Sequence, residues 1–590
     1  MKRRVPAWVL VGCSSLLPCG CGGETKPEPK APPAAVTASS APILECPPWA
    51  TPASNGRDCE STRLTQFLEE SQQKLQAEPA KGTPSWFDPF VEELTRKYVA
   101  EFDTLEPMTR VRLLKALVAH PDPRSVPALR KALQEYARSP RDKNYQDLAL
   151  ACDAASKLRR LDSPDLGPDL LAAFLTFRFT TQTGGLAYRP LSAALLAHRD
   201  RSWTKPLMAA LEVDFPNRGK PDDLQAAKAF NDAVFLQVTS AQLLGLLGNP
   251  RAVDPLLRVT LDPAKLQAAF TAIFALVRLG RPARERTQAL LEGNVPELTA
   301  FAKERAARLD AVPDEHPHVS MAALILGTMG HPDGEATLVA AAKRERGKAL
   351  YGVAKGLTRL GKTPKSEAAF KAAFARIDTK QVAYDRPALA ELADDASYYS
   401  DPALVPWLLQ RAKLTQGPAE AVKQVREALL NTAIQLMTAA QVGNVEAAVK
   451  SLGDEAQATR LALAKELALK CKDAPKCYLA ELVSAQNQTA ERTSVGVKAA
   501  HMLAAFGDAA ARDELVQYWS SIRHPEVANA AALAIDRLTP NGSLELADEL
   551  QAYIDAQGKA PGSVRLTSAL QSVTYRLRAR APERTLGKDG

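Results

Sequence analysis

The segment Leu246-Leu247-Gly248-Asn249-Pro250-Arg251-Ala252-Val253-Asp254-Pro255-Leu256-Leu257 joins the end of one expected helix to the start of the next. An apolar helix ends at Leu247, and Gly248 can adopt the left-handed conformation that closes a helix C-terminus. Pro255 lacks a backbone N–H, so it fits best within the first turn of a helix, where that donor has no internal partner. The second helix is therefore expected to begin no earlier than about Ala252.

Weaker copies of this joint recur at residues 120–129, 161–164, 329–333, 360–364, 400–406 and 506–508. The first apolar residues of the following helices form a series of anchors spaced by roughly 38 residues, which is the length of two short helices and two turns. Sustained alternation of apolar and polar residues is missing, so the chain is predicted to be all-α. The anchors are Leu129, Leu170, Leu207, Leu256, Leu290, Leu338, Phe370, Leu408, Val449, Leu479, Leu515 and Leu550.

The joint from Gly248 to Leu257 resembles the Gly-Asp/Asn-Pro-x-Ala-Val-x-Pro-Leu-Leu pattern of HEAT repeats, in the short variety first described in phycobilisome-lyase-like proteins. The segment from Pro121 to Leu129 resembles it well, and the other joints are degenerate. The resemblance covers residues 107–580 and implies an α-solenoid of about 11–12 helical hairpins forming a curved superhelix. It also implies an inner surface that binds partners, and it implies no common reaction.

Composition agrees with a stack of repeats. Apolar residues make up 46% and charged residues 24% of the 590 residues, an ordinary globular balance. One compact core of this size would be unusual, whereas each repeat of a stack buries its apolar face against its neighbours. The formal net charge of +8 includes the three basic residues at positions 2–4, so no nucleic-acid partner is expected. The basic run at residues 576–580 is expected to be a solvated helix face.

The N-terminus has the features of an export signal. Lys2, Arg3 and Arg4 precede an apolar stretch, residues 5–17, that is too short to span a bilayer as a helix. Residues 10–13 resemble a bacterial lipobox ending in Cys13, but acylation there would leave a very short leader. Cys21 leaves a leader of ordinary length. We therefore expect a lipid anchor on Cys21 or Cys13, and an ordinary cleaved signal is the alternative.

These features divide the chain into five regions. Residues 1–21 are a lipoprotein-type signal peptide, and residues 22–45 are a tether rich in Pro, Ala and Ser without apolar periodicity. Residues 46–106 are expected to form a helical cap, because two of its segments each gather their apolar residues on one helical face. The repeat solenoid covers residues 107–580, and residues 581–590 are a frayed tail.

The cysteine spacing agrees with export. Cys46 and Cys59 bracket a short loop, and Cys471 and Cys477 bracket a segment that replaces the usual Gly-Asp-Pro joint of its repeat. In an oxidising compartment each pair is expected to form a local disulfide. A structural zinc site is the rival interpretation, but no histidine lies near either pair.

Motifs for catalysis are missing from the sequence, including the Gly-x-Ser-x-Gly elbow, the phosphate-binding Gly-x-x-x-x-Gly-Lys and His-Glu-x-x-His. We therefore expect no catalytic residue and no cofactor. One cluster, Asp314-Glu315-His316-Pro317-His318, could ligate a divalent metal. Such a segment between two repeats is usually a solvated turn, so no metal site is assigned to it.

Two functions remain open. The first is a membrane-tethered, non-catalytic scaffold that holds a protein or peptide partner in the bacterial cell envelope, on its periplasmic or surface face. The second is an envelope enzyme or small-ligand carrier with a pocket between repeats, at the irregular region 177–200 or at His316 and His318. A continuous groove lined by second helices would favour the scaffold. Carboxylates and histidines that converge in a closed pocket would favour the enzyme.

Overall fold

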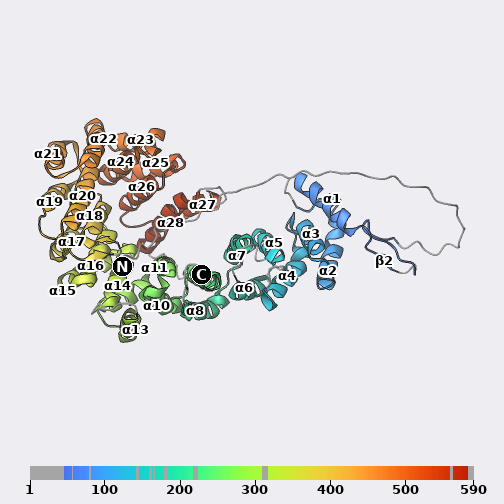
Figure 1. Ribbon diagram of the computed structural model, residues 1–590. Coiled ribbons are helices and arrows are strands. Elements are labelled where there is room, and N and C mark those ends of the chain that lie inside the picture. Colours follow the sequence, from blue (N-terminus) through green and yellow to red (C-terminus); the bar gives the residue numbers. More distant parts are fainter. Residues whose placement is uncertain are drawn as a thin grey trace, which may run out of the picture. The chain divides into compact units, whose positions relative to one another are not determined.

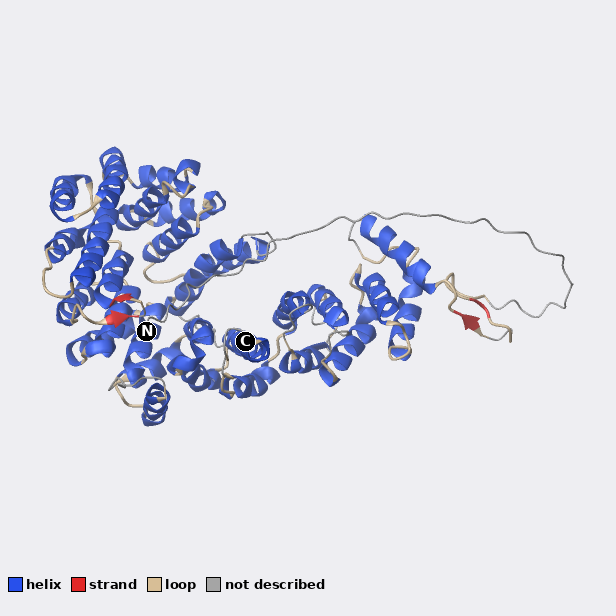
Figure 2. Cartoon of the chain, viewed as in Figure 1, coloured by secondary structure: helices blue, strands red, loops and turns tan. Residues whose placement is uncertain are grey.

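The computed structural model describes residues 45–55, 58–78, 82–140, 145–158, 163, 166–178, 184–216, 219, 223–308, 316–383, 385–557 and 563–581. Figure 2 shows that nearly all of the regular structure is helical. The chain divides into two compact units, residues 1–67 and residues 68–590, and each is described by itself.

The first unit contains a short two-stranded sheet. Its strands β1 (Thr51–Pro52) and β2 (Cys59–Glu60) pair in antiparallel fashion. A disulfide from Cys46 to Cys59 ties the segment before β1 to β2. The indole of Trp49 is buried, and its ring centroid lies 4.8 Å from that of Phe67. One covalent link and one aromatic contact therefore stabilise a unit that is too small for a large core.

The second unit consists of helical hairpins, each with a first helix, a joint and a second helix (Figure 1). The first helices are α3 (Pro107–Val118), α5 (Tyr145–Lys157), α7 (Gly184–His198), α9 (Leu224–Leu247), α11 (Leu266–Leu279), α14 (Pro317–Met329), α16 (Gly347–Leu360), α18 (Ala388–Asp395), α20 (Ala419–Leu436), α22 (Glu455–Cys471), α24 (Thr493–Phe506) and α26 (Pro525–Arg537). The second helices are α4 (Val126–Arg138), α6 (Leu166–Thr176), α8 (Thr204–Glu212), α10 (Val253–Leu261), α12 (Arg281–Leu291), α15 (Glu335–Arg344), α17 (Pro364–Arg376), α19 (Val405–Ala412), α21 (Val442–Leu452), α23 (Pro475–Val483), α25 (Ala509–Gln517) and α27 (Leu544–Gln557).

Four helices lie outside this alternation: α1 (Leu64–Ala77) and α2 (Val91–Ala100) precede it, α13 (Pro296–Ala307) follows α12, and α28 (Ser563–Arg580) ends it. A small antiparallel pair, β3 (Val382–Ala383) with β4 (Arg386–Pro387), separates α17 from α18. The described part of the chain thus holds twelve hairpins. The predicted fold class, an all-α solenoid of helical hairpins, is confirmed.

The anchors expected from the sequence each lie on a different second helix, from Leu129 on α4 to Leu550 on α27. All of them are at most 5% exposed. Each hairpin therefore buries one such side chain against its neighbours, which is why the spacing of the anchors reports the repeats.

The joint at Gly248 explains how one hairpin turns. Gly248 closes α9 in the left-handed conformation, with a φ of 68°. The side chain of Asn249 then accepts a hydrogen bond from the Arg251 N–H and caps a 3-10 turn that leads into α10. His331 and Asp401 have the same role in their joints. The polar residue before the proline is therefore an N-cap in these repeats.

The first helices α14 and α16 are in backbone contact. A Cβ atom at Gly327 of α14 would collide with the carbonyl oxygen of Gly356 on α16, and one at Gly356 would collide with that of Ala323. Gly352 of α16 lies equally close to Ser320 of α14. Only glycine permits such an approach. These residues therefore let the first helices pack more closely than larger side chains would allow.

Seven first helices from α11 onward, all except α22, form a closed ring together with α28. α11, α14, α16, α18, α20, α24, α26 and α28 contact one another in this order. α28 also contacts α11 and α14, so the last helix returns to the start of the series (Figure 1). We call residues 266–580 the closed ring. Repetition predicts that neighbours stack, but it does not predict a contact between residues 249 positions apart in the chain.

Basic side chains cap the C-terminal ends of three helices in the ring. Such ends carry carbonyl groups without internal partners, where lysine and arginine are favourable. Lys498 of α24 donates three hydrogen bonds to carbonyls at the end of α20. Arg537 of α26 donates to carbonyls at the end of α16, and Arg576 of α28 to those at the end of α14. These caps come from later repeats, so they also hold the ring together.

Candidate functional site

The expected lipidation residues, Cys13 and Cys21, lie outside the described residues. The four cysteines expected to pair form two disulfides, Cys46 with Cys59 and Cys471 with Cys477. Cys152 is free and buried on α5, and burial raises the pKa of its thiol. A thiol with a raised pKa is a poor nucleophile at neutral pH. No reactive cysteine site therefore emerges from the described residues.

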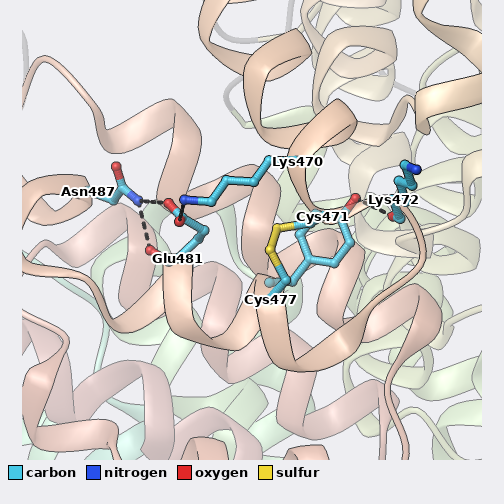
Figure 3. The surroundings of a disulfide bond; sticks show 7 residues. Lys470, Cys471, Lys472, Cys477, Glu481 and Asn487 are labelled. Atoms are coloured by element: carbon cyan, nitrogen blue, oxygen red, sulfur yellow. Dashed lines mark hydrogen bonds and ion pairs between the residues drawn. A yellow bond between two sulfur atoms is a disulfide. The ribbon is translucent and has the colours of Figure 1, made fainter.

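The second disulfide, between Cys471 and Cys477, links the end of α22 covalently to the start of α23 (Figure 3). Lys472 follows Cys471 with a φ of 50°, a conformation that the other joints assign mostly to glycine. The Tyr478 hydroxyl donates to the Lys472 carbonyl at 2.7 Å. Nearby, Glu481 accepts from Lys470 at 2.7 Å and from the Asn487 side chain at 3.0 Å. These contacts fix the backbone of the joint and leave no ligand-binding groups converging on it.

The histidine cluster does not assemble a metal site among the described residues. His316 Nδ1 lies 2.8 Å from Oε2 of Glu345. The other carboxylate oxygen of Glu345, Oε1, accepts a hydrogen bond from Arg344 Nε at 2.6 Å. His318 is buried, and burial followed by the charge of His316 lowers its pKa to about 4. No group of three or more potential ligands gathers in the described part of the chain. Residues 314 and 315 lie outside it.

The region 177–200 is more regular than expected. α7 occupies residues 184–198 and continues through Pro190, so the helix tolerates a proline in its interior. Residues 179–183 lie outside the described residues. The expectation of an irregular region at 177–200 was wrong for residues 184–198, because burial of one face of α7 against α5 and α6 outweighs the local cost of Pro190.

A pocket of about 320 Å³ lies inside the closed ring, and we call it the central pocket. Four helices that are distant in sequence, α11, α14, α26 and α28, provide most of its lining. Its apolar wall consists of Phe270, Ile273, Phe274, Leu324, Leu533 and Val573. Its polar floor consists of Arg359, Tyr398, Asp536, Arg537 and Arg576.

Asp536 organises the polar floor. Its carboxylate accepts from Arg576 Nη2 at 2.9 Å and from Arg580 Nη2 at 2.5 Å, and Arg537 lies 3.5 Å away. Burial alone would raise the pKa of Asp536, but the three guanidinium charges outweigh burial and hold the pKa well below its usual range. The carboxylate is therefore ionised and fully engaged, so it is poorly suited to act as a general base.

Two lining residues remain available to a ligand. The Arg359 guanidinium lies 3.9 Å from the centroid of the Tyr398 ring. Its ion pair with the Asp395 carboxylate is long, at 3.8 Å, so the charge of Arg359 is weakly compensated. Phe270 is 58% exposed, although it belongs to a helix of the ring. A pocket lined by an exposed aromatic ring and by a weakly compensated cation suits a ligand that carries both an apolar group and a carboxylate.

A buried serine and histidine also meet in the ring. Ser400 Oγ lies 3.0 Å from His501 Nδ1. Burial, followed by the charges of Lys498 and Arg537, lowers the pKa of His501 to about 4. Ser400 holds the left-handed position that Gly248 has in its joint, with a φ of 49°. The pair therefore completes a joint, and its histidine is too weak a base for catalysis near neutral pH.

The polar floor was not expected from the sequence. Residues 576–580 were expected to be a solvated helix face, but Arg576 and Arg580 are each only 8% exposed, so that expectation was wrong. Arg576 and Asp536 lie 40 positions apart, about one repeat, and no local motif connects them. The density of arginine in the last helix was the one feature of the sequence that could have indicated this cluster of charges.

Comparison with known proteins supports the repeat assignment locally. Residues 109–135 match the family model of the PBS lyase HEAT-like repeat, so the hairpin of α3 and α4 is a HEAT-like repeat. No curated protein matches the chain. Among solved structures, the chain is similar to a circular tandem repeat protein described as having a novel repeat topology and enhanced subunit contact surfaces. The identity is 10%, the coverage 86% of this chain and 97% of the other, and the TM-score 0.18.

Proposed function

We propose that this protein is a lipid-anchored scaffold that holds a protein or peptide partner in the bacterial cell envelope and catalyses no reaction. The observation that carries the proposal is the central pocket, whose lining contains an exposed phenylalanine and three arginines. A pocket of this kind suits a docking segment that places an apolar side chain next to a carboxylate. The closed ring would present the central pocket to a partner with little rearrangement of its backbone.

The location in the envelope is supported by the cysteines and the N-terminal sequence. Disulfides persist in oxidising compartments, and the described residues contain two of them. Residues 1–21 have the pattern of a lipoprotein signal, and residues 22–45 have the composition of a tether. Among the helices that the structure describes, none is long and apolar enough to cross a membrane.

The absence of catalysis is supported by the chemistry of the pocket. Its one carboxylate is neutralised by arginines, and its lining contains no histidine or cysteine. Among the described lining residues, the hydroxyl groups of Thr328, Tyr398 and Ser572 have no histidine and no free carboxylate to activate them, so the set suits binding of an anion better than nucleophilic or base catalysis. The arrangement therefore favours binding over reaction.

The proposal is tested by purifying the tagged protein from solubilised membranes and quantifying bound proteins by mass spectrometry. Phe270→Ser and Arg359→Gln alter the central pocket, and Leu469→Ser changes a similarly exposed apolar residue on α22 as the control. We expect a partner with the wild type and the control that is depleted about tenfold or more with the pocket variants. Equal recovery with all four proteins contradicts the proposal.

The same preparation distinguishes the second candidate function, a small-ligand carrier. The volume of about 320 Å³ lies within the size range of small-molecule sites. If a small molecule is released on denaturation and no protein is enriched, the protein is a small-ligand carrier and the scaffold proposal is wrong. Mass analysis of the N-terminal peptide tests the anchor in the same sample: an acylated Cys13 or Cys21 supports it, and an unmodified N-terminus beyond residue 21 contradicts it.

A further inference from the structure

A second pocket lies where α28 returns to the start of the closed ring. Its volume is about 660 Å³, and its lining comes from the end of α11, the start of α12, the joint before α15, the joint before α27 and the end of α28. Five arginines and one histidine are among the lining residues. They are Arg278, Arg281, Arg284, Arg578, Arg580 and His331, and we call this pocket the arginine pocket.

The acidic groups of the arginine pocket do not balance its arginines. Only two carboxylates, those of Glu285 and Asp333, belong to the lining. Both are more than half exposed, and they pair with Arg281 at 2.7 Å and with Arg284 at 3.0 Å. Exposed ion pairs are weak and exchange easily with other partners. Arg578 and Arg580 pair with carboxylates outside the lining, those of Asp548 at 2.6 Å and Asp536 at 2.5 Å, so an incoming anion competes with existing ion pairs and adds an acceptor for Arg278.

Two arginines of the arginine pocket stand out. Arg278 forms no ion pair with a carboxylate among the described residues, and its guanidinium lies 5.3 Å from the centroid of the Tyr575 ring. Arg580 is only 8% exposed, and its Nε has no hydrogen-bond partner among the described residues. Arg580 Nη2 already donates to Asp536 at 2.5 Å, so only its Nε N–H is left for a ligand to accept from.

We propose that the arginine pocket binds an oxyanion that carries more than one negative charge, as a phosphate group or as two or more carboxylate groups of one ligand. Guanidinium groups present parallel donors that match the oxygen atoms of both groups. The arginines come from three helices that meet only when α28 closes the ring, so a bound anion would also bridge the closure. Such an anion could belong to a small free ligand or to the headgroup of a lipid.

Isothermal titration of the full chain tests this proposal. Pyrophosphate and citrate serve as free ligands, and vesicles of phosphatidylcholine with or without phosphatidylglycerol serve as lipid surfaces. We expect binding that weakens as salt increases. Arg278→Gln and Arg281→Gln should each weaken it about tenfold, the loss expected for one charge-assisted contact.

Arg308→Gln is the control, because Arg308 is an exposed arginine directly after α13 that pairs with Glu304 and does not line the pocket. Thermal unfolding of each variant shows that it is folded. Binding of pyrophosphate or citrate identifies a free ligand, and binding of anionic vesicles alone identifies a lipid headgroup. Absence of binding to every probe, or equal loss with Arg308→Gln, overturns the proposal. Recovery of a protein partner depends on Phe270 and Arg359, so the two proposals fail separately.

Discussion

At the scale of single residues, Gly248 determines how a hairpin turns. Its φ of 68° is easily reached by glycine and costs other residues about 1–2 kcal/mol. A Cβ atom at this position would meet no other atom within 4 Å, so substitution adds conformational strain without a collision. Ser400 shows that the joint tolerates another residue when a buried hydrogen bond, here to His501, accompanies it.

We expect Gly248→Ala to lower the free energy of unfolding by about 1 kcal/mol, because alanine resists the left-handed conformation. Chemical denaturation of the two proteins measures the difference. The matched control is Gly443→Ala on α21, where the backbone has no positive φ and the added Cβ also meets nothing within 4 Å. If the control loses as much stability as Gly248→Ala, the left-handed conformation of Gly248 does not explain the loss.

Lys498 predicts a pH dependence of stability. Burial lowers its pKa to about 7, whereas a lysine in the unfolded chain has a pKa of about 10.4. Between these values the unfolded chain keeps a proton that the folded chain has lost. The unfolding free energy should therefore rise with pH in this window, by up to about 1.4 kcal/mol per pH unit.

Denaturation at pH 7 and pH 9, for the wild type and for Lys498→Met, measures this contribution. Lys498→Met lacks the titrating group, so its stability should rise less over this range. Parallel pH profiles for the two proteins would show that the carbonyl groups at the end of α20 keep Lys498 charged, contrary to the expectation.

At the scale of the element, backbone contact between α14 and α16 depends on glycine. A side chain at Gly356 would meet the carbonyl oxygen of Ala323, which belongs to a rigid helix and cannot move aside. We expect Gly356→Ala to destabilise the protein by about 2 kcal/mol despite the better helix propensity of alanine. Thermal unfolding checks this, and a neutral or stabilising effect would mean that the two helices are not in contact in solution.

The joints and the anchors could be predicted from the sequence because each depends on residues that are close together in the chain. Gly248, Asn249 and Pro255 report a turn locally, and Leu256 reports burial through its spacing from other anchors. The polar floor could not be predicted in this way. Arg576 acquires its partners on α14 only when α28 returns to that helix, and Arg537 of α26 acquires its partners on α16 only when α26 comes back to that helix. Both contacts depend on the curvature accumulated over many repeats.

At the scale of the whole molecule, closure of the ring means that distant repeats stabilise one another. Arg576 connects three of them, because it binds Asp536 of α26 and caps the end of α14. A solenoid without closure would transmit the effect of a substitution only to adjacent repeats. The closed ring should transmit it from α28 to helices more than 200 positions earlier in the chain.

We therefore expect Arg576→Leu to destabilise the protein by about 2–4 kcal/mol, since it leaves buried carbonyl groups without donors. Hydrogen exchange should increase in α11, α14 and α28 and stay unchanged in α3 to α6. Arg578→Leu on the same helix is the control, because Arg578 pairs with an exposed aspartate. Faster exchange confined to α26 and α28 would contradict the closure.

Binding of a partner at the central pocket is tested most directly by photo-crosslinking from position 270 in intact cells. Benzoylphenylalanine can replace Phe270 with little disturbance, because that side chain is largely exposed, and the same amino acid at the exposed Tyr518 provides the control. After irradiation, we expect a covalent adduct with one envelope protein from position 270 and none of that adduct from position 518. Identical adducts from both positions, or no protein adduct from position 270, would contradict this expectation.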